Sequence, residues 1–397
     1  MKKALLFATL LPVLAFAQAD NSDYLQKVLR SLEQIETSSF HIRSMAYAPY
    51  DTIPSVHEQF VKAFANPTDT TLGVKFLIFD PKDTTRLLFG YDGVRKAYIE
   101  HSEKAVGADD FSTLRLPFRP VSMPFFNYAE NILRYALTTS DKIETQLEEN
   151  GDMYHFKLTV DEERQIEFFG HAYHMPNPSP DPRSIYEIWI RKSDGMPCRI
   201  RREMEHQTTI ATVSRVSINT LPRSDWQLTD YFPTGYEVYY KGAQKNRPKP
   251  SFSILGHQAP VWDLPGTNEK NVSLGDFDGK IVLINFTGIG CGACYTAIPF
   301  LNKLTERYKP ADFALAAIES WGKSLHSVQM YSIHNKLKYP LLVGTEEVVK
   351  VYLPTPAVPV FILLDRHHIV RKVFEGYSES MDGEIAQAID SLLQEPK

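Results

Sequence analysis

The stretch IVLINFTGIGCGACYTAIPFL, residues 281–301, decides the fold of the C-terminal part of this chain. Residues 281–286 are nearly all apolar and rich in β-formers, which is typical of a parallel strand buried on both faces. A glycine-bearing loop, 287–290, leads to Cys291-Gly-Ala-Cys294. Apolar residues then recur at helical spacing, at Ile298, Leu301 and Leu304. The order strand, loop, C-x-x-C and helix predicts an α/β domain with two cysteines at a helix start.

Cysteines in this position are suited to redox chemistry. A thiolate at a helix N-terminus faces unpaired N–H groups and the positive end of the helix dipole. We therefore expect the pKa of the Cys291 thiol to fall, which makes it a nucleophile near neutral pH. Cys294 lies one turn further on and can attack the mixed disulfide that Cys291 forms with a substrate.

Two other interpretations of the C-x-x-C compete with the redox dithiol. Zinc usually takes four ligands, and the chain has no second cysteine pair to complete such a site. A purely structural disulfide is the other alternative. The strand–loop–helix context favours the redox dithiol over both. We therefore predict no metal site here.

Taken with the sequence around it, this motif resembles the TlpA/ResA type of thioredoxin-like domain, the thiol–disulfide oxidoreductases of bacterial envelopes. The resemblance covers residues 252–397, over a third of the chain. The matching stretches are GHQAP at 256–260, SLGDF at 273–277, GKIVLINF at 279–286, the C-x-x-C, IPFL at 298–301 and TPAVPVFILLD at 355–365.

The resemblance implies roles for four residues. Cys291 would attack and Cys294 would resolve, while Pro359 would be cis and face the dithiol. Val358 would then present its backbone to an extended substrate as a strand-like edge. A trans Pro359 in an ordinary loop is the alternative. The family needs no metal or small cofactor, so its partners are protein thiols and disulfides and, for a reductase, a membrane thiol donor.

This chain departs from the family at three positions. The family usually has Trp immediately before the first cysteine, where this chain has Gly290. Many members carry an acidic residue three positions after the second cysteine, where this chain has Ala297. Asn285 stands where thioredoxin proper has a buried Asp. We therefore expect no nearby acid to assist proton transfer, which affects rate and redox poise more than the dithiol chemistry.

Composition and the N-terminus indicate where the protein works. The 397 residues are 43% hydrophobic and 23% charged, with a net charge of −5, which gives no sign of nucleic-acid binding. Residues 1–17 combine two lysines, a short apolar core and Ala15-Phe-Ala17, the pattern of a cleaved signal peptide. An uncleaved membrane anchor is the alternative. No cysteine lies near the cut, so we expect a secreted, periplasmic protein without a lipid anchor.

Residues 20–240 predict a separate β-rich domain. After a helix with Ser22 as its N-cap, short strands follow one another, interrupted by a helix over residues 124–137. The pattern predicts a curved antiparallel sheet or half-barrel, so the whole protein is α+β with two domains. Residues 185–201 resemble the LolA-like fold, in which a half-barrel cradles a helix and an apolar cavity. A lipid or lipoprotein would then be a ligand of this domain.

The stretch KGAQKNRPKPS, residues 241–251, is basic and proline-bearing and predicts a linker before the thioredoxin-like domain at 252–397. The remaining cysteine, Cys198, falls in a predicted strand, where a small buried side chain is the expected role. The sequence is therefore compatible with two functions. One is an envelope thiol–disulfide oxidoreductase, and the other is a lipid or lipoprotein binder with an auxiliary thioredoxin-like domain.

Overall fold

The computed structural model describes residues 11–51, 53–112, 119–161, 165–175, 183–222, 225–241 and 252–395. The chain divides into two compact units. The first comprises Met1–Ala46, Ser55–Met204 and Thr208–Asn246, and the second comprises Tyr47–Pro54, Glu205–Gln207 and Arg247–Lys397. Of the predicted linker only Lys241 is described, and the first ten residues of the predicted signal peptide lie outside the described residues.

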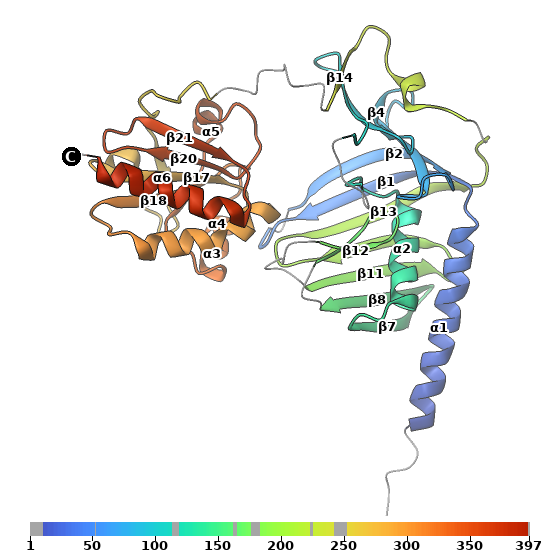
Figure 1. Cartoon of the computed structure of the whole chain (residues 1–397). Helices are drawn as coiled ribbons and strands as arrows, with labels where there is room; N and C mark the ends of the chain where they lie inside the picture. Colours follow the sequence, from blue (N-terminus) through green and yellow to red (C-terminus); the bar gives the residue numbers. More distant parts are fainter. Residues whose placement is uncertain are drawn as a thin grey trace, which may run out of the picture. The chain divides into compact units, whose positions relative to one another are not determined.

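One open sheet of 12 strands forms the framework of the first unit (Figure 1). Its order is β14-β6-β5-β4-β3-β2-β1-β13-β12-β11-β8-β7. The strands are β1 (Thr37–Tyr47), β2 (Ser55–Ala65), β3 (Val74–Phe79), β4 (Leu87–Tyr91), β5 (Lys96–Glu100), β6 (Ala105–Asp109), β7 (Ile143–Asn150), β8 (Met153–Asp161), β11 (Arg183–Arg191), β12 (Pro197–Glu203), β13 (Thr208–Ile218) and β14 (Glu237–Tyr240). Neighbouring strands are antiparallel from β6 to β1 and from β13 to β7, and β14 and β6 run parallel. A separate two-stranded sheet pairs β9 (Ile166–Phe168) with β10 (Ala172–His174).

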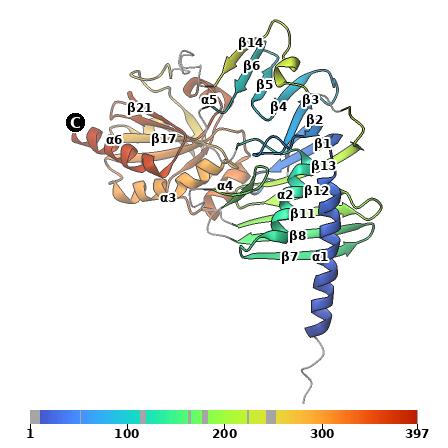
Figure 2. The ribbon, with the colours of Figure 1, turned by 45° about the vertical axis from the view of Figure 1, so that its right-hand side comes forward.

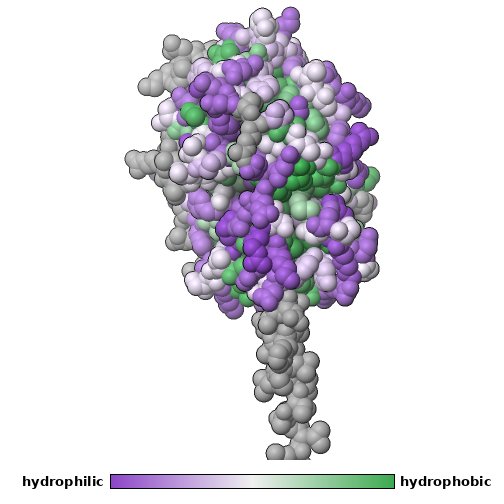
Figure 3. Space-filling view, turned by 90° about the vertical axis from the view of Figure 1, so that its right-hand side faces the viewer, coloured by the Kyte–Doolittle hydropathy of each residue, from purple (hydrophilic) through white to green (hydrophobic). Residues whose placement is uncertain are grey.

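Two helices pack with this sheet, α1 (Leu11–Glu33) and α2 (Phe125–Thr138) (Figures 1 and 2). Both bury apolar side chains in one core with the sheet, including Leu25, Leu32, Ile132 and Leu133. Between Ser22 and Glu33 the exposed residues of α1 are polar, and hydrophilic side chains run along this face in Figure 3. Among the described residues, none of the helices combines the length and apolarity needed to cross a membrane.

The β-rich character and the helix predicted over 124–137 are confirmed, but other details differ. The helix expected to begin after Ser22 begins at Leu11, because the residues before Ser22 are mostly good helix formers and α1 is continuous through it. Strand β7 was not predicted, since its sequence IETQLEEN is largely polar and exposed. The described strands form no closed barrel, and the half-barrel and the LolA-like fold stay predictions.

The second unit contains a five-stranded sheet in the order β19-β18-β17-β20-β21. The strands are β17 (Ile281–Thr287), β18 (Phe313–Glu319), β19 (Leu341–Val343), β20 (Val360–Leu364) and β21 (Val370–Glu375). Strand β17 is parallel to β18 and antiparallel to β20, so the predicted parallel pairing holds on one side only. A small hairpin, β15 (Asp263–Pro265) with β16 (Asn271–Ser273), precedes the sheet.

All seven residues of β17 are buried, because both faces of its sheet are covered. Ile281 and Leu283 point to a core shared with α3 (Gly292–Arg307), α4 (Leu325–His334) and α6 (Asp382–Gln394). The alternate residues Val282, Ile284 and Phe286 point to a second core with β15 and α5 (Glu346–Tyr352). Successive side chains of β17 point to opposite faces of the sheet, so its apolar run packs into both cores. The sheet is therefore the middle of three layers.

Candidate functional site

The two cysteines of the C-x-x-C lie at the start of α3, directly after the loop that follows β17. Cys291 is the N-cap of α3, and its Sγ accepts a hydrogen bond from the backbone N–H of Cys294 at 3.1 Å. The two side chains form a disulfide, with their Cα atoms 5.2 Å apart. Cys291 keeps 9% of its surface exposed and Cys294 only 2%. The outer sulfur is therefore the more accessible of the pair.

The loop before β20 brings the other two predicted site residues to this sulfur. The Val358–Pro359 peptide bond is cis. The Sγ of Cys291 lies 3.8 Å from the carbonyl oxygen of Val358. This meeting follows from the sheet, because Phe286 at the end of β17 pairs with Val360 at the start of β20. All four predicted residues thus meet at one edge of the sheet.

The structure places the three positions that depart from the family pattern as follows. Gly290 has φ +99°, a conformation that side-chain-bearing residues rarely adopt. Ala297 is fully buried in α3. Asn285 is 2% exposed within β17, and its Oδ1 has no hydrogen-bond partner among the described residues. None of these three positions supplies an acid to the dithiol.

One acidic residue near the dithiol loop was missed by the sequence argument. Glu319 ends β18, where it pairs with Thr287 of β17, and its side chain is fully buried. Its carboxylate accepts hydrogen bonds from the backbone N–H groups of Ile289 (3.4 Å), Trp321 (3.1 Å) and Lys323 (2.9 Å). Burial raises the pKa of the Glu319 carboxyl above its ordinary value, and these N–H groups oppose that effect.

The carboxylate of Glu319 ties together two loops. Ile289 lies two residues before Cys291, whereas Trp321 and Lys323 belong to the connection between β18 and α4. A signal was present in the sequence: a single acid directly after the apolar run of residues 313–318. In a parallel pair such a residue lies beside the end of the neighbouring strand. The expectation that no acid assists proton transfer at the dithiol stays a prediction, and the structure adds one buried acid, Glu319, bonded to the loop before Cys291.

Other chemistry-bearing groups in the described residues offer weaker candidates. Cys198 is buried in β12, as predicted, and burial raises the pKa of its thiol. Among the described residues no three His, Cys, Asp or Glu side chains gather as a metal site would require.

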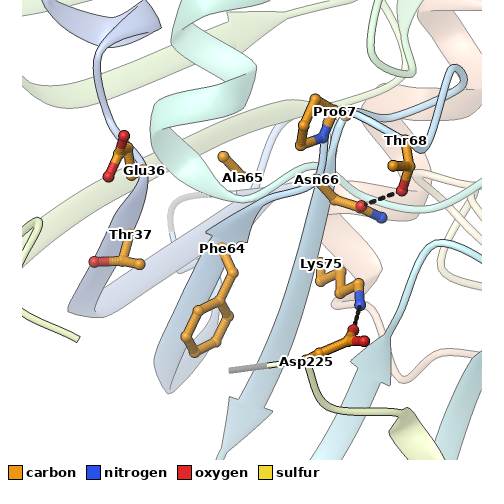
Figure 4. Close-up of a pocket in the computed structure, with 10 residues that line it drawn as sticks. Glu36, Thr37, Phe64, Ala65, Asn66, Pro67, Thr68, Lys75 and Asp225 are labelled. Carbon is orange, nitrogen blue, oxygen red and sulfur yellow. Dashed lines mark hydrogen bonds and ion pairs between the residues drawn. The ribbon is translucent and has the colours of Figure 1, made fainter. Parts of the chain in front are cut away.

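Figure 4 shows a pocket of about 600 Å³ in the first unit, beside the ends of β2 and β3. Polar groups in it bond to one another: Lys75 Nζ lies 3.4 Å from Asp225, and the Thr68 hydroxyl donates to Asn66 Oδ1 at 2.8 Å. The pocket is lined by Glu36, Thr37, Phe64, Ala65, Asn66, Pro67, Thr68, Gly73, Lys75 and Asp225. It holds no nucleophilic thiol, so the Cys291–Cys294 pair is the candidate active site.

Comparison with known proteins assigns a family to the part of the chain that carries the dithiol. Residues 255–373 match the AhpC/TSA family. The thiol-disulfide oxidoreductase ResA of Bacillus cereus is 26% identical over 144 residues, which are 36% of this chain and 78% of that protein. ResA of Bacillus subtilis is 27% identical over 127 residues, 32% of this chain and 70% of that protein.

A solved structure was also found, the thioredoxin domain of a thiol-disulfide oxidoreductase from Bacteroides vulgatus. It is 22% identical with a TM-score of 0.30, and the match covers 34% of this chain and 97% of that chain. The relatives match about a third of this chain. On the sequence matches, the second unit is a thioredoxin-like domain of the TlpA/ResA type, and it is an oxidoreductase domain.

Proposed function

We propose that this protein is a periplasmic thiol–disulfide oxidoreductase that reduces disulfides of other proteins through Cys291 and Cys294. One observation carries the proposal: the disulfide caps α3 with its more exposed sulfur 3.8 Å from the Val358 carbonyl. A sulfur in this position can be reached by a substrate that lies along the loop of Val358 and Pro359. The similarity to ResA proteins supports the same chemistry.

The reaction proceeds by two exchanges from the reduced protein. The Cys291 thiolate attacks one sulfur of the substrate disulfide, which forms a mixed disulfide and releases the first substrate thiolate. Cys294, deprotonated, then attacks the Cys291 sulfur and releases the second substrate thiolate. Two electrons have passed to the substrate, both substrate thiolates take protons from solvent, and the Cys291–Cys294 disulfide remains.

The oxidised protein needs a reductant before it can act again. We propose that a membrane thiol donor reduces the disulfide by the reverse pair of exchanges and is itself oxidised. The assignment to the periplasm is supported by residues 1–17, which have the pattern of a signal peptide cleaved before Gln18 or Asp20. Mass spectrometry of the protein from an envelope fraction tests this, since an intact Met1 would contradict it.

The proposed activity is tested by reduction of a disulfide-bonded protein with dithiothreitol as the electron source. The full chain should accelerate the reduction well above the rate with dithiothreitol alone. The Cys291→Ser/Cys294→Ser double variant should lose this acceleration, whereas Cys198→Ser, a buried thiol in the first unit, should keep it. Equal rates with the native chain and the double variant would contradict the proposal.

A second candidate function concerns the first unit, where one observation favours a ligand. A cavity of about 280 Å³ lies between α2 and the sheet and is mostly apolar. Its walls come from Phe40, Ile42, Ser44, Gln59, Val61, Phe76, Ile78, Ser122, Met123, Pro124, Phe125, Tyr128, Ile200, Arg202, Thr209, Ile210 and Ala211. A lipid or acylated protein would suit such walls.

This second function is tested by mass spectrometry of organic extracts of the purified chain. We expect a lipid with the native protein and less with Ala211→Phe, whose larger side chain would occupy the cavity. Extracts of both proteins without any lipid would contradict lipid binding and leave the redox proposal intact.

A further inference from the structure

One large aromatic side chain stands exposed beside the dithiol loops. Trp321, in the connection between β18 and α4, has 45% of its surface exposed. An indole stabilises a folded protein when its large apolar area is removed from water. An exposed indole can stabilise a bound ligand in the same way. Its position is not that of a loosely held surface residue, because three contacts fix it.

The first contact is with the loop that leads to the attacking cysteine. The indole lies so close to Gly288 that an added Cβ would meet its ring atoms Cδ2, Cε3 and Cε2 at 2.5, 2.6 and 2.8 Å. Gly288 also accepts the backbone hydrogen bond of Cys291 at 3.1 Å. The ring therefore rests on the residue that holds the Cys291 backbone.

The other two contacts hold the indole N–H and the backbone of Trp321. The indole N–H of Trp321 donates to the carbonyl oxygen of Pro356 at 3.4 Å, two residues before Val358. Its backbone N–H donates to the buried carboxylate of Glu319 at 3.1 Å. The side chain thus spans the two loops that flank Cys291, one carrying Gly288 and the other Pro356.

The two loops that flank this indole carry no charged side chain, whereas its own loop carries Lys323, which is paired with Asp51. Neither 288–294 nor 354–358 contains an ionisable group apart from the two cysteines. Residues 354–357 are exposed, and three of them are Pro, Pro and Ala. A substrate segment laid across these loops would meet aromatic and aliphatic surface, which favours apolar side chains.

Resting on the proposed function, we propose that Trp321 is a specificity-determining residue. It takes an apolar side chain next to the reacting cysteine of a polypeptide substrate while the substrate's disulfide meets Cys291. Small disulfides without such a side chain gain nothing from the indole. Glu319 is a positioning residue in this arrangement, since it holds the Trp321 backbone.

The test compares three disulfide substrates reduced by the full chain with dithiothreitol, which ends as its cyclic disulfide. Two peptides with an internal disulfide differ only in the residue beside the first cysteine, Leu or Ser. The third substrate is hydroxyethyl disulfide. The native chain should prefer the Leu peptide over the Ser peptide by kcat/KM.

Trp321→Ala should lower kcat/KM for the Leu peptide about tenfold, chiefly through KM, a loss of about 1.4 kcal/mol. The same variant should change turnover of hydroxyethyl disulfide less than about twofold, because the loss of an apolar contact is confined to substrates that make it. Trp321→Phe should recover most of the preference. Val261→Ala, which trims another exposed apolar residue of this unit, should match the native chain.

A double-variant cycle separates contact from folding. Gly288→Ala should displace the indole and reduce the Leu preference, because its Cβ would overlap the ring. In the Trp321→Ala background the same change should cost nothing further, since no ring is left to displace. A full additional loss there would show that Gly288→Ala acts through Cys291, and would count against the indole.

The results of these experiments distinguish the role of Trp321 from the oxidoreductase function. An unchanged Leu preference in Trp321→Ala overturns the role of Trp321 and leaves the oxidoreductase intact. Equal losses on all three substrates also overturn it, since they indicate damage to the dithiol. A native chain that reduces none of the three contradicts the proposed function and this role together.

Discussion

The Sγ of Cys291 lies 3.8 Å from the carbonyl oxygen of Val358. These residues are far apart in sequence, and the pairing of β17 with β20 brings them together. The arrangement places a redox-capable sulfur beside a loop whose residues 354–357 are exposed.

Removing the resolving cysteine should stall the reaction at its mixed disulfide. Cys294→Ser should accumulate disulfide-linked partners, because the more exposed Cys291 still attacks. Cys291→Ser should not, since the remaining sulfur is 2% exposed. Non-reducing gels of envelope extracts, with mass identification of trapped proteins, measure this. The Cys198→Ser background should behave as the native chain, and equal trapping by both single variants would reverse the assigned roles.

The pKa of the Cys291 thiol in the reduced protein should lie below that of a free thiol, about 8.5. The reason is its place at the N-terminus of α3, where backbone N–H groups and the helix dipole favour the thiolate. In Cys198→Ser/Cys294→Ser only Cys291 remains, so thiolate absorbance against pH reports this group alone. A midpoint at or above the free value would show that the helix does not activate the thiol.

Glu319 should make stability depend on pH in a defined direction. Burial raises the pKa of its carboxyl above the ordinary 4.5, so the folded state holds the proton more tightly than the unfolded state. Its contribution to stability is therefore full below pH 4.5 and declines as pH rises through the raised value. Glu319→Gln lacks this titration.

The test of Glu319 is the free energy of unfolding of both proteins across the acid-to-neutral range. The native chain should lose stability relative to Glu319→Gln as pH rises, even if the amide is less stable throughout because it satisfies fewer backbone N–H groups. Other titrating groups are common to both proteins and cancel. A difference that is constant with pH, or grows in favour of the native chain, would contradict the direction given.

The middle strand of the second unit should be intolerant of a cavity. Phe286 is fully buried in β17, with its ring centroid 5.1 Å from that of Tyr352. Phe286→Ala should cost about 3–5 kcal/mol of folding stability. Val261→Ala, at a position 87% exposed, should stay within about 0.5 kcal/mol. Calorimetry should show two transitions with only one of them lowered in Phe286→Ala, whereas a single lowered transition would mean that the units unfold together.

Local pattern alone was enough for the central elements of the second unit. The apolar run of residues 281–286 predicts β17, because a strand with both faces covered needs no polar alternation. The C-x-x-C predicts the start of α3, since the helical spacing of Ile298, Leu301 and Leu304 begins just after it. The polar strand β7 escaped prediction because an exposed edge strand lacks the alternation that marks a buried one.

Apart from the acid that directly follows the apolar run of residues 313–318, what surrounds the dithiol was decided by tertiary structure. Glu319 and Trp321 reach the loop of Cys291 because β18 runs parallel to β17 and ends level with it, with Thr287 opposite Glu319. No spacing in the sequence encodes that register, which depends on how the side chains of both strands pack into the two cores. The sequence by itself determined that a dithiol sits at a helix start, and strand pairing determined which acid and which indole stand beside it.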